Sequence, residues 1–229
     1  MAAFGKNFIL ATLWLCTMFA TPSQQIECKG HDNYKIDPMA RDLILELHNR
    51  KRMETARGQY KNGRNSFYIS YGKNILEMKY DCDLETKAHE IASACPETET
   101  LQATLTDQGE NFIKINKEYP EIGSPTQAVY IAGTTWFEEI TKNGINQNLD
   151  FTQNFANKKP TVYHWSQMVW AKSWKIGCEI GACGKFTIVV CRYSPKGNVV
   201  GQKVYQPYQR LACENGESLG YSSLCAYPS

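Results

Sequence analysis

The stretch Tyr163-His164-Trp165-Ser166-Gln167-Met168-Val169-Trp170-Ala171-Lys172-Ser173 separates two kinds of periodicity in this chain. Its apolar side chains predict a short apolar helix from His164 to Ala171. The two runs that follow, KIGCEIG (175–181) and KFTIVVCRY (185–193), are short and rich in β-branched residues, and residues 182–184 between them predict a hairpin. The chain therefore changes from helix to strand at this stretch.

Longer helices are predicted before this stretch. The first begins at Asp37-Pro38, where the aspartate suits the cap and the proline suits the first turn. Asp83 is predicted to cap the second, and the third begins at Ser124 and ends at Gly144. Because helices come first and strands last, we expect an α+β fold with helices packed on a mainly antiparallel sheet.

The N-terminus has the pattern of a secretory signal peptide. Lys6 precedes an almost uninterrupted apolar run from Phe8 to Ala20, and small and turn-forming residues follow it. A run of about 13 residues is too short to cross a bilayer, and no later segment supplies a transmembrane anchor. We expect cleavage after Ser23, which assigns residues 1–23 to the signal peptide, although cleavage after Ala20 also fits.

Composition and cysteine content fit a secreted globular domain. The net charge of +2 is small and no run of four Lys or Arg occurs, so nucleic acid is not an expected partner. Eight cysteines remain after the signal peptide, which predicts four disulfides whose pairing stays open. They are Cys28, Cys82, Cys95, Cys178, Cys183, Cys191, Cys213 and Cys225. Their spacing matches no zinc finger.

Two stretches resemble the signatures of the CAP superfamily, which comprises cysteine-rich secretory, antigen 5 and pathogenesis-related proteins. The first is Tyr163–Ser173, in which only Tyr163 departs from the pattern, and the second is Ile188–Val199. Three upstream blocks resemble the family's other motifs in the expected order. They are Leu47-His48-Asn49-Arg50, Gly109-Glu110-Asn111 and Trp136-Phe137-Glu138-Glu139-Ile140. The chain is most similar to the venom-allergen-like, activation-associated secreted proteins of parasitic nematodes.

The resemblance implies a three-layer αβα sandwich with a mainly antiparallel sheet, stabilised by disulfides. We expect the CAP domain to cover residues 37–205. Residues 24–36 would form an N-terminal extension, and residues 206–229 a cysteine-containing tail of the same domain.

The resemblance also implies a central cavity with two histidines and two glutamates. Glu110, Glu139 and His164 occupy three of these positions, and they are our candidate metal ligands. The interval CPETETLQATLTDQGEN, where the family has its first histidine, contains none, and His89 lies too early. Zinc favours imidazole nitrogen, so the incomplete set suits a harder divalent cation in the central cavity, or a buried hydrogen-bond network without metal.

No catalytic residue is predicted, and we expect the protein not to be an enzyme. Ser166 lies two residues from His164, and such positions do not face each other on a helix. If the segment were extended they would share a face, but no nucleophile elbow accompanies them. A metal-dependent hydrolase that uses the three cavity residues is retained as an alternative.

Members of the family bind apolar ligands in two places. Fatty acids would lie between the first helix and the helix that carries Trp136, and sterols would contact an aromatic loop that corresponds here to residues 144–156. Leu149, Phe151 and Phe155 are the candidate lipid-binding residues of that loop. In the alternative interpretation the loop is solvated, and these residues only anchor it.

Other noticeable side chains are expected to be structural. Trp136, Phe137, Trp165 and Trp170 are interpreted as core residues, and His48 as a packing residue of the first helix.

Taken together, these patterns predict a secreted, extracellular parasite effector. It would bind fatty acid or sterol, or host extracellular proteins, and would modulate host immunity. A module that contacts host receptors through its surface, without a small ligand, is the alternative.

Overall fold

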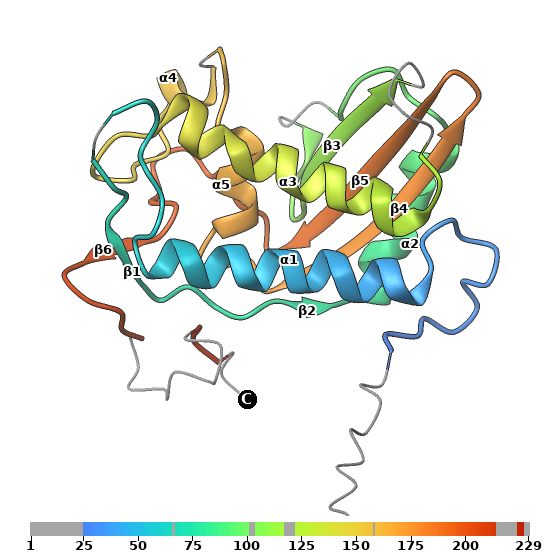
Figure 1. Ribbon diagram of the computed structural model, residues 1–229, viewed down its shortest axis with the longest axis horizontal. Helices are drawn as coiled ribbons and strands as arrows, with labels where there is room; N and C mark the ends of the chain where they lie inside the picture. Colours follow the sequence, from blue (N-terminus) through green and yellow to red (C-terminus); the bar gives the residue numbers. More distant parts are fainter. Residues whose placement is uncertain are drawn as a thin grey trace, which may run out of the picture.

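Figure 1 shows the computed structural model, which describes residues 25–65, 67–100, 104–116, 122–157, 159–213 and 224–226. The predicted signal peptide, residues 1–23, lies outside the described residues, as does part of the predicted tail. Within the ranges just given, no helix combines the length and apolar character that a membrane span requires.

In the described part of the chain the central sheet has four strands in the order β2-β4-β5-β3. They are β2 (Lys79–Tyr80), β3 (Gly109–Asn116), β4 (Lys175–Cys183) and β5 (Phe186–Ser194). β4 and β5 form the predicted hairpin, β3 pairs antiparallel with β5, and the short β2 runs parallel to β4. A separate small sheet pairs β1 (Tyr71–Lys73) with β6 (Gln206–Tyr208).

Helices cover both faces of the central sheet (Figure 1). One face packs against α2 (Cys82–Ser93), and the other faces α1 (Pro38–Ala56), α3 (Pro125–Asn143) and α5 (Tyr163–Val169). A small core lies under α2, and a larger one lies among the remaining helices and the sheet. A short helix, α4 (Gln153–Ala156), lies in the loop between α3 and α5. This arrangement confirms the predicted αβα sandwich with its mainly antiparallel sheet.

The helix ends follow local capping chemistry, with one correction. The Asp37 carboxylate accepts the backbone N–H of Ala40 at 2.7 Å, as predicted for the start of α1. Gly144 ends α3 with a φ of 66°, a left-handed conformation that favours glycine. The cap of α2 is Asp81 and not Asp83, because Asp81 has the extended backbone that a cap needs and accepts the N–H of Leu84.

The boundaries of α5 and several strands also differ from the sequence pattern. α5 ends at Val169, before the predicted Ala171, because Trp170 adopts an extended backbone with φ −56° and ψ 119°. The pattern does not predict β3, nor the short strands β1, β2 and β6.

The side chains predicted to be structural are buried. Trp136, Phe137, Trp165 and Trp170 are at most 3% exposed, which confirms their place in the core. The His48 ring lies within hydrogen-bonding distance of the Ile44 carbonyl and the Tyr193 hydroxyl, at 2.7 and 2.8 Å. Burial lowers the pKa of His48 to about 4, so it packs as a neutral ring.

The eight cysteines pair as four disulfides. These are Cys28–Cys82, Cys95–Cys183, Cys178–Cys191 and Cys213–Cys225. The first ties the N-terminal extension to the start of α2, and the last lies in the tail that follows β6. Both terminal segments are therefore joined to the sandwich, one by a disulfide and the other by the pairing of β1 with β6.

Candidate functional site

The predicted pair of Glu139 and His164 forms at the start of α5. Glu139 lies on α3, and its Oε1 is 2.6 Å from Nδ1 of His164. Its Oε2 accepts the backbone N–H groups of His164 and Trp165 at 2.9 and 3.0 Å. Val162, the residue before the helix, provides no side-chain cap. Glu139 therefore holds the His164 ring and also satisfies free N–H groups at the helix N-terminus.

The other side of the His164 ring faces Glu99, which precedes β3. Nε2 lies 3.4 Å from Oε2 of Glu99, at ion-pair distance but without hydrogen-bond geometry. Burial alone would lower the pKa of His164, but the contacts and charges of Glu139 and Glu99 raise it to about 9. The same contact with His164 lowers the pKa of Glu99. At neutral pH the ring is an imidazolium between two carboxylates.

Glu110, the third predicted ligand, has different partners. Its fully buried carboxylate is 2.9 Å from Nη1 of Arg192, the residue directly opposite it in the pairing of β3 with β5. It also accepts hydrogen bonds from the backbone N–H and the hydroxyl of Thr100, at 2.9 and 3.0 Å. The positive charge beside Glu110 is therefore a protein side chain. The consecutive residues Glu99 and Thr100 link the Glu110–Arg192 pair to His164, because Glu99 faces the ring and Thr100 donates to Glu110. We call the group the cavity cluster, although only Glu99 and His164 line the cavity described below; it consists of Glu99, Glu110, Glu139, His164 and Arg192.

The cavity cluster fits a divalent cation poorly. The Nδ1 atom of His164 faces Glu139, and the Oε2 atom of Glu139 is occupied by two backbone N–H groups. Glu110 is already neutralised by Arg192, whose charge would repel a cation nearby. A metal at His164 would also have to displace the ring proton that Glu139 and Glu99 stabilise. Apart from Nε2 of His164, which has no hydrogen-bond partner among the described residues, these polar groups are paired within the protein, as in the hydrogen-bond network considered above as the alternative to metal binding.

A cavity opens beside this cluster, with a volume of about 450 Å³. Its lining combines charged, amide and apolar side chains from the loops around α4, α5 and β5. They are Glu99, Phe151, Gln153, Ala156, Asn157, Lys159, Thr161, Tyr163, His164, Lys196, Gly197, Asn198, Val199 and Val200.

The predicted lipid-binding residues lie mostly in the core. Leu149 and Phe151 are each 1% exposed, and Phe155 is 8% exposed. The Phe151 ring packs edge-on against Phe155, Tyr163 and Trp170, with centroids about 6 Å apart. Phe151 is the member of this set that lines the cavity beside His164.

The predicted fatty-acid groove between α1 and α3 is filled where the helices cross. A Cβ added to Gly133 of α3 would lie 3.3 Å from Cδ1 of Leu47 and 3.4 Å from Cδ1 of Ile44, both on α1. Because Gly133 has no side chain, α1 and α3 approach each other closely, and the side chains of Leu47 and Ile44 fill the space between the helices at this position.

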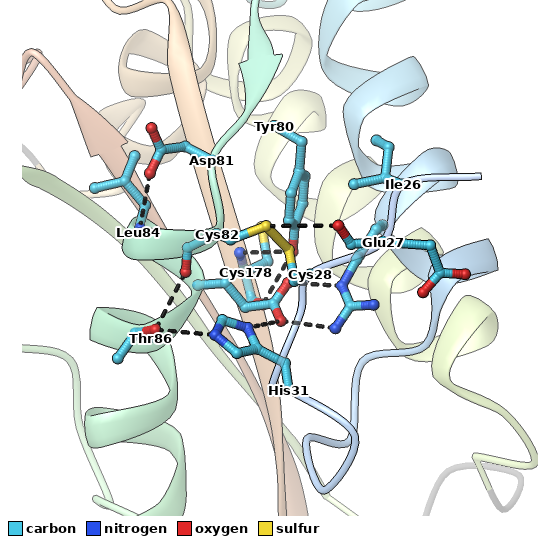
Figure 2. The surroundings of a disulfide bond; sticks show 12 residues. Ile26, Glu27, Cys28, His31, Tyr80, Asp81, Cys82, Leu84, Thr86 and Cys178 are labelled. Atoms are coloured by element: carbon cyan, nitrogen blue, oxygen red, sulfur yellow. Dashed lines mark hydrogen bonds and ion pairs between the residues drawn. A yellow bond between two sulfur atoms is a disulfide. The ribbon is translucent and has the colours of Figure 1, made fainter. Parts of the chain in front are cut away.

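A second group of histidines and glutamates fastens the N-terminal extension to the sandwich. Figure 2 shows His31 beside the Cys28–Cys82 disulfide, facing Thr86 of α2. Nδ1 of His31 is 2.7 Å from Glu85, a fully buried carboxylate of α2. We call the group the N-terminal cluster, and it consists of His31, Tyr34, Arg41, Tyr80, Glu85, His89 and Glu179.

Glu85 is the centre of that cluster. Arg41 of α1 binds it through Nε and Nη2, each at 2.7 Å, and the Tyr80 hydroxyl donates to it at 2.6 Å. Among the described residues, potential ligand atoms of Glu85, Cys28 and His31 lie within 4.8 Å of one another. The disulfide removes the thiolate of Cys28, and Arg41 already neutralises Glu85, so this group does not fit a metal either.

Tyr34 links two parts of the N-terminal cluster. Its ring stacks on His31 and on His89, with centroids 4.3 and 3.8 Å apart. His89 lies 3.2 Å from Glu179 of β4, which also accepts the backbone N–H of Ile36 at 2.9 Å. Burial raises the pKa of Glu179.

Sequence reasoning missed Glu99 and Arg192. Glu99 lies in the interval where the family has its first histidine, so the departure from the motif was itself a signal. Arg192 stands beside Cys191 in the second signature, but its pairing with Glu110 depends on the register of β3 and β5. No sequence motif identified the residues of the N-terminal cluster as a group.

Comparison with known proteins places the chain in a family. The profile of the "Cysteine-rich secretory protein family" (CAP) matches residues 45–193, and the chain belongs to this family. It is 27% identical to Ancylostoma secreted protein from Ancylostoma caninum, over 93% of this chain. The match covers 50% of that protein, so this chain spans half the length of that relative.

Solved structures agree with this assignment. The structure of BmVAL-1 has a TM-score of 0.78 and 30% identity, and the match covers 89% of this chain and 100% of that one. The crystal structure of NaASP2 with Zn²⁺ has a TM-score of 0.74 and 29% identity, covering 85% of this chain and 98% of that one. The predicted family and fold are confirmed.

Proposed function

We propose that this chain is a secreted CAP protein that binds an amphipathic lipid of the fatty-acid class and is not an enzyme. The observation that carries the proposal is the cavity of about 450 Å³ beside His164. Small-molecule sites have volumes of this order and combine apolar walls with a few polar groups. Here Phe151, Ala156, Val199 and Val200 supply the apolar part.

The charged part of the lining suits a carboxylate head group. The charged residues of the lining are Lys159, Lys196, His164 and Glu99. Because Glu139 and Glu99 balance the charge of His164, the two lysines supply the excess positive charge. An excess of positive charge attracts an anionic head group, while the apolar side chains receive the start of an acyl chain. This combination favours a fatty acid over an uncharged ligand.

A sterol at the 144–156 loop is less well supported. Leu149 and Phe155 are buried and do not belong to the lining of the cavity beside His164, whereas Phe151 does. Their contacts support the alternative in which these residues anchor the loop. We therefore assign the ligand to the cavity, with Phe151 as the contribution of the loop.

The lipid proposal is tested by titrating delipidated protein with cis-parinaric acid and with cholesterol. We expect saturable uptake of the fatty acid, and a loss of about tenfold or more in affinity for Val200→Trp, which fills the cavity. Met39→Trp is the matched control, because Met39 is 61% exposed on α1, outside the cavity lining. Absence of saturable uptake, or equal affinity of both variants, would refute the proposal.

The surroundings of Ser166 support binding over hydrolysis. The Ser166 side chain is buried in α5, and its hydroxyl donates to Oδ1 of Asn198 at 2.6 Å, while the Tyr163 carbonyl oxygen lies 3.0 Å from the same hydroxyl. Its neighbour His164 is held as a cation, which cannot accept a proton from serine. The metal-dependent hydrolase would also need the divalent cation that the cavity cluster fits poorly.

Secretion and host interaction complete the proposal. The signal-peptide pattern and four disulfides support an extracellular protein, and the name of the Ancylostoma relative describes a secreted protein. Host extracellular proteins and modulation of host immunity are proposed as partners and outcome. A pull-down from host serum with cavity-filled Val200→Trp protein separates surface binding from lipid binding. Recovery of the same host proteins by wild type and variant would favour the surface-mediated alternative.

The extent of the domain is also a proposal. We take residues 37–205 as the CAP domain, with residues 24–36 and 206–229 as parts of the same folded unit. The Cys28–Cys82 disulfide and the pairing of β6 with β1 support this division. Mass spectrometry of protein secreted into culture medium tests the N-terminus, which we expect at Gln24.

A further inference from the structure

The loop before β1 and the loop after α3 lie at the end of the molecule away from α2 (Figure 1). Residues of these two loops line a second hollow. Its volume is about 450 Å³. Its lining consists of aromatic, amide, hydroxyl and apolar residues, and none of them is charged. They are Asn62, Phe67, Tyr68, Ile69, Ser70, Asn146, Gln147, Asn148, Leu149 and Pro207. This hollow therefore differs in chemistry from the charged cavity beside His164.

Exposed aromatic side chains gather around this hollow. Phe67 and Tyr68 belong to its lining and are 65% and 60% exposed. Tyr71 and Tyr208, each 46% exposed, lie directly opposite each other in the small sheet whose neighbouring residues Ser70 and Pro207 line the hollow. Aromatic rings left in water in one region indicate a contact surface.

The loop that forms the other side is held rigidly. The Asn62 amide donates to the Ile145 carbonyl at 2.8 Å and accepts the Ile145 N–H at 2.7 Å. Likewise, the Asn146 amide donates to the Asp150 carbonyl and accepts the Asp150 N–H. These contacts fix both flanks of the loop tip, so a ligand would meet a site that is already ordered.

In the described part of the chain, two amide side chains at the tip of the loop after α3 make no hydrogen bond that holds the loop in place. Gln147 and Asn148 are exposed, and within the described residues no hydrogen bond is formed by either side chain. Each amide offers a donor pair and an acceptor side by side. Such groups complement neighbouring hydroxyls, which also donate and accept.

We propose that this hollow binds a neutral saccharide, with Phe67 and Tyr68 against the apolar face of a sugar ring and Gln147 and Asn148 hydrogen-bonded to its hydroxyls. The lining residues are uncharged, and the nearby ammonium of Lys203, which donates to the Asn148 carbonyl, is paired with Asp150, so an acidic ligand would find no unpaired counter-charge in the lining. The amides disfavour an acyl chain, because its burial would leave them without hydrogen-bond partners. A proline-rich peptide also fits aromatic grooves, but it offers mainly carbonyl acceptors and would leave the amide oxygens unmatched.

The test uses full mature protein labelled with ¹⁵N and three neutral probes: chitotriose, mannotriose and lactose. NMR titration of each probe follows the amide signals of the two loops. Phe67→Ala/Tyr68→Ala removes the stacking surface, and Gln147→Ala/Asn148→Ala removes the free amides. Both variants change exposed side chains, so the fold is retained. Tyr130→Ala is the matched control, because Tyr130 is a 52% exposed aromatic on α3, outside the lining.

We expect saturable shifts with at least one saccharide, and a loss of affinity of about tenfold or more in each double variant. The control should bind like wild type. Three results would overturn the proposal: no saccharide binds, binding survives both double variants, or decaproline binds while the saccharides do not. Fatty-acid uptake by the cavity beside His164 is measured separately, so failure of one proposal leaves the other distinguishable.

Discussion

Histidine and glutamate pairs occur in two regions of this molecule, with different consequences. In the cavity cluster, the His164 ring lies between two carboxylates at the wall of an open cavity. In the N-terminal cluster, His31 of the terminal segment contacts the buried carboxylate of Glu85 on α2, and His89 of α2 contacts that of Glu179 on β4. The residue types are alike, but one group faces a space that a ligand could enter and the other fastens the chain to itself. The surroundings of such a pair, and not its composition, indicate whether it belongs to a binding site.

The largest effect is expected from removing Arg41 in the N-terminal cluster. Glu85 is fully buried and Arg41 is 4% exposed, so Arg41→Leu leaves a buried charge without its counter-ion. We expect a loss of about 3–5 kcal/mol in the free energy of unfolding, measured by urea denaturation at pH 7. Adding Glu85→Gln should recover most of it. Arg192→Leu in the cavity cluster should cost less, because Arg192 is more exposed, at 12%. If Arg192→Leu lost as much unfolding free energy as Arg41→Leu, or more, the comparison would be contradicted.

The cavity cluster should make stability depend on pH through His164. Its pKa is raised from 6.5 to about 9, so it adds stability that is fully present below about pH 6.5 and is lost as the pH rises through about 9. The contribution is on the order of 3 kcal/mol. Urea denaturation at pH 6.5 and 9.5 measures it, with an NMR titration of the ring.

Two variants identify the cause of this pH dependence. Glu139→Gln should reduce it more than Glu99→Gln, because Glu139 is 2.6 Å from the ring and Glu99 is 3.4 Å away. An unchanged pKa of His164 in Glu139→Gln would show that another group sustains the shift.

The sequence predicted the long elements of the fold better than the short ones. α1 and α3 are 19 residues long and have capping residues and an apolar stripe, and the β4–β5 hairpin has β-branched strands. β2 has only two residues and is defined by its parallel pairing with β4. β3 is buried over most of its length, so its apolar and polar residues do not alternate as those of a half-buried strand do.

In the candidate sites, too, some residues are identified by local motifs, whereas the contacts of others depend on the tertiary fold. Motif positions identified Glu110, Glu139 and His164, but Arg192 required the register of two strands. In the N-terminal cluster the contact between His31 and Glu85 spans 54 positions of the chain, and that between His89 and Glu179 spans 90. Pairings of this kind follow from the tertiary fold, and no local pattern in a single sequence encodes them.

The third prediction concerns zinc. Wild-type protein should show no change in stability with 100 µM zinc, because the cavity cluster offers one protonated imidazole and an internal cation. Glu99→His with Arg192→Gln should gain zinc-dependent stability, since it adds a second imidazole and removes the cation. At a hundredfold excess of zinc over Kd the gain would be about 2.7 kcal/mol.

Thermal unfolding with zinc and with a chelator measures this gain. Glu97→His with the same Arg192→Gln change is the matched control, because it adds a histidine two positions away on the same loop. Equal stabilisation of wild type by zinc would show that the cavity cluster binds metal as it stands.

The smallest effect is expected from Tyr34, which connects the two histidines of the N-terminal cluster. Its ring stacks on both, so Tyr34→Ala should cost about 1 kcal/mol in unfolding free energy and increase hydrogen exchange in residues 28–36. Tyr34→Phe keeps the ring and should behave like wild type. If the phenylalanine variant loses as much as the alanine variant, the hydroxyl and not the stack holds the segment. Because Tyr34 lies in neither cavity lining, both variants should retain lipid uptake, which separates the fastening role of one cluster from the binding role of the other.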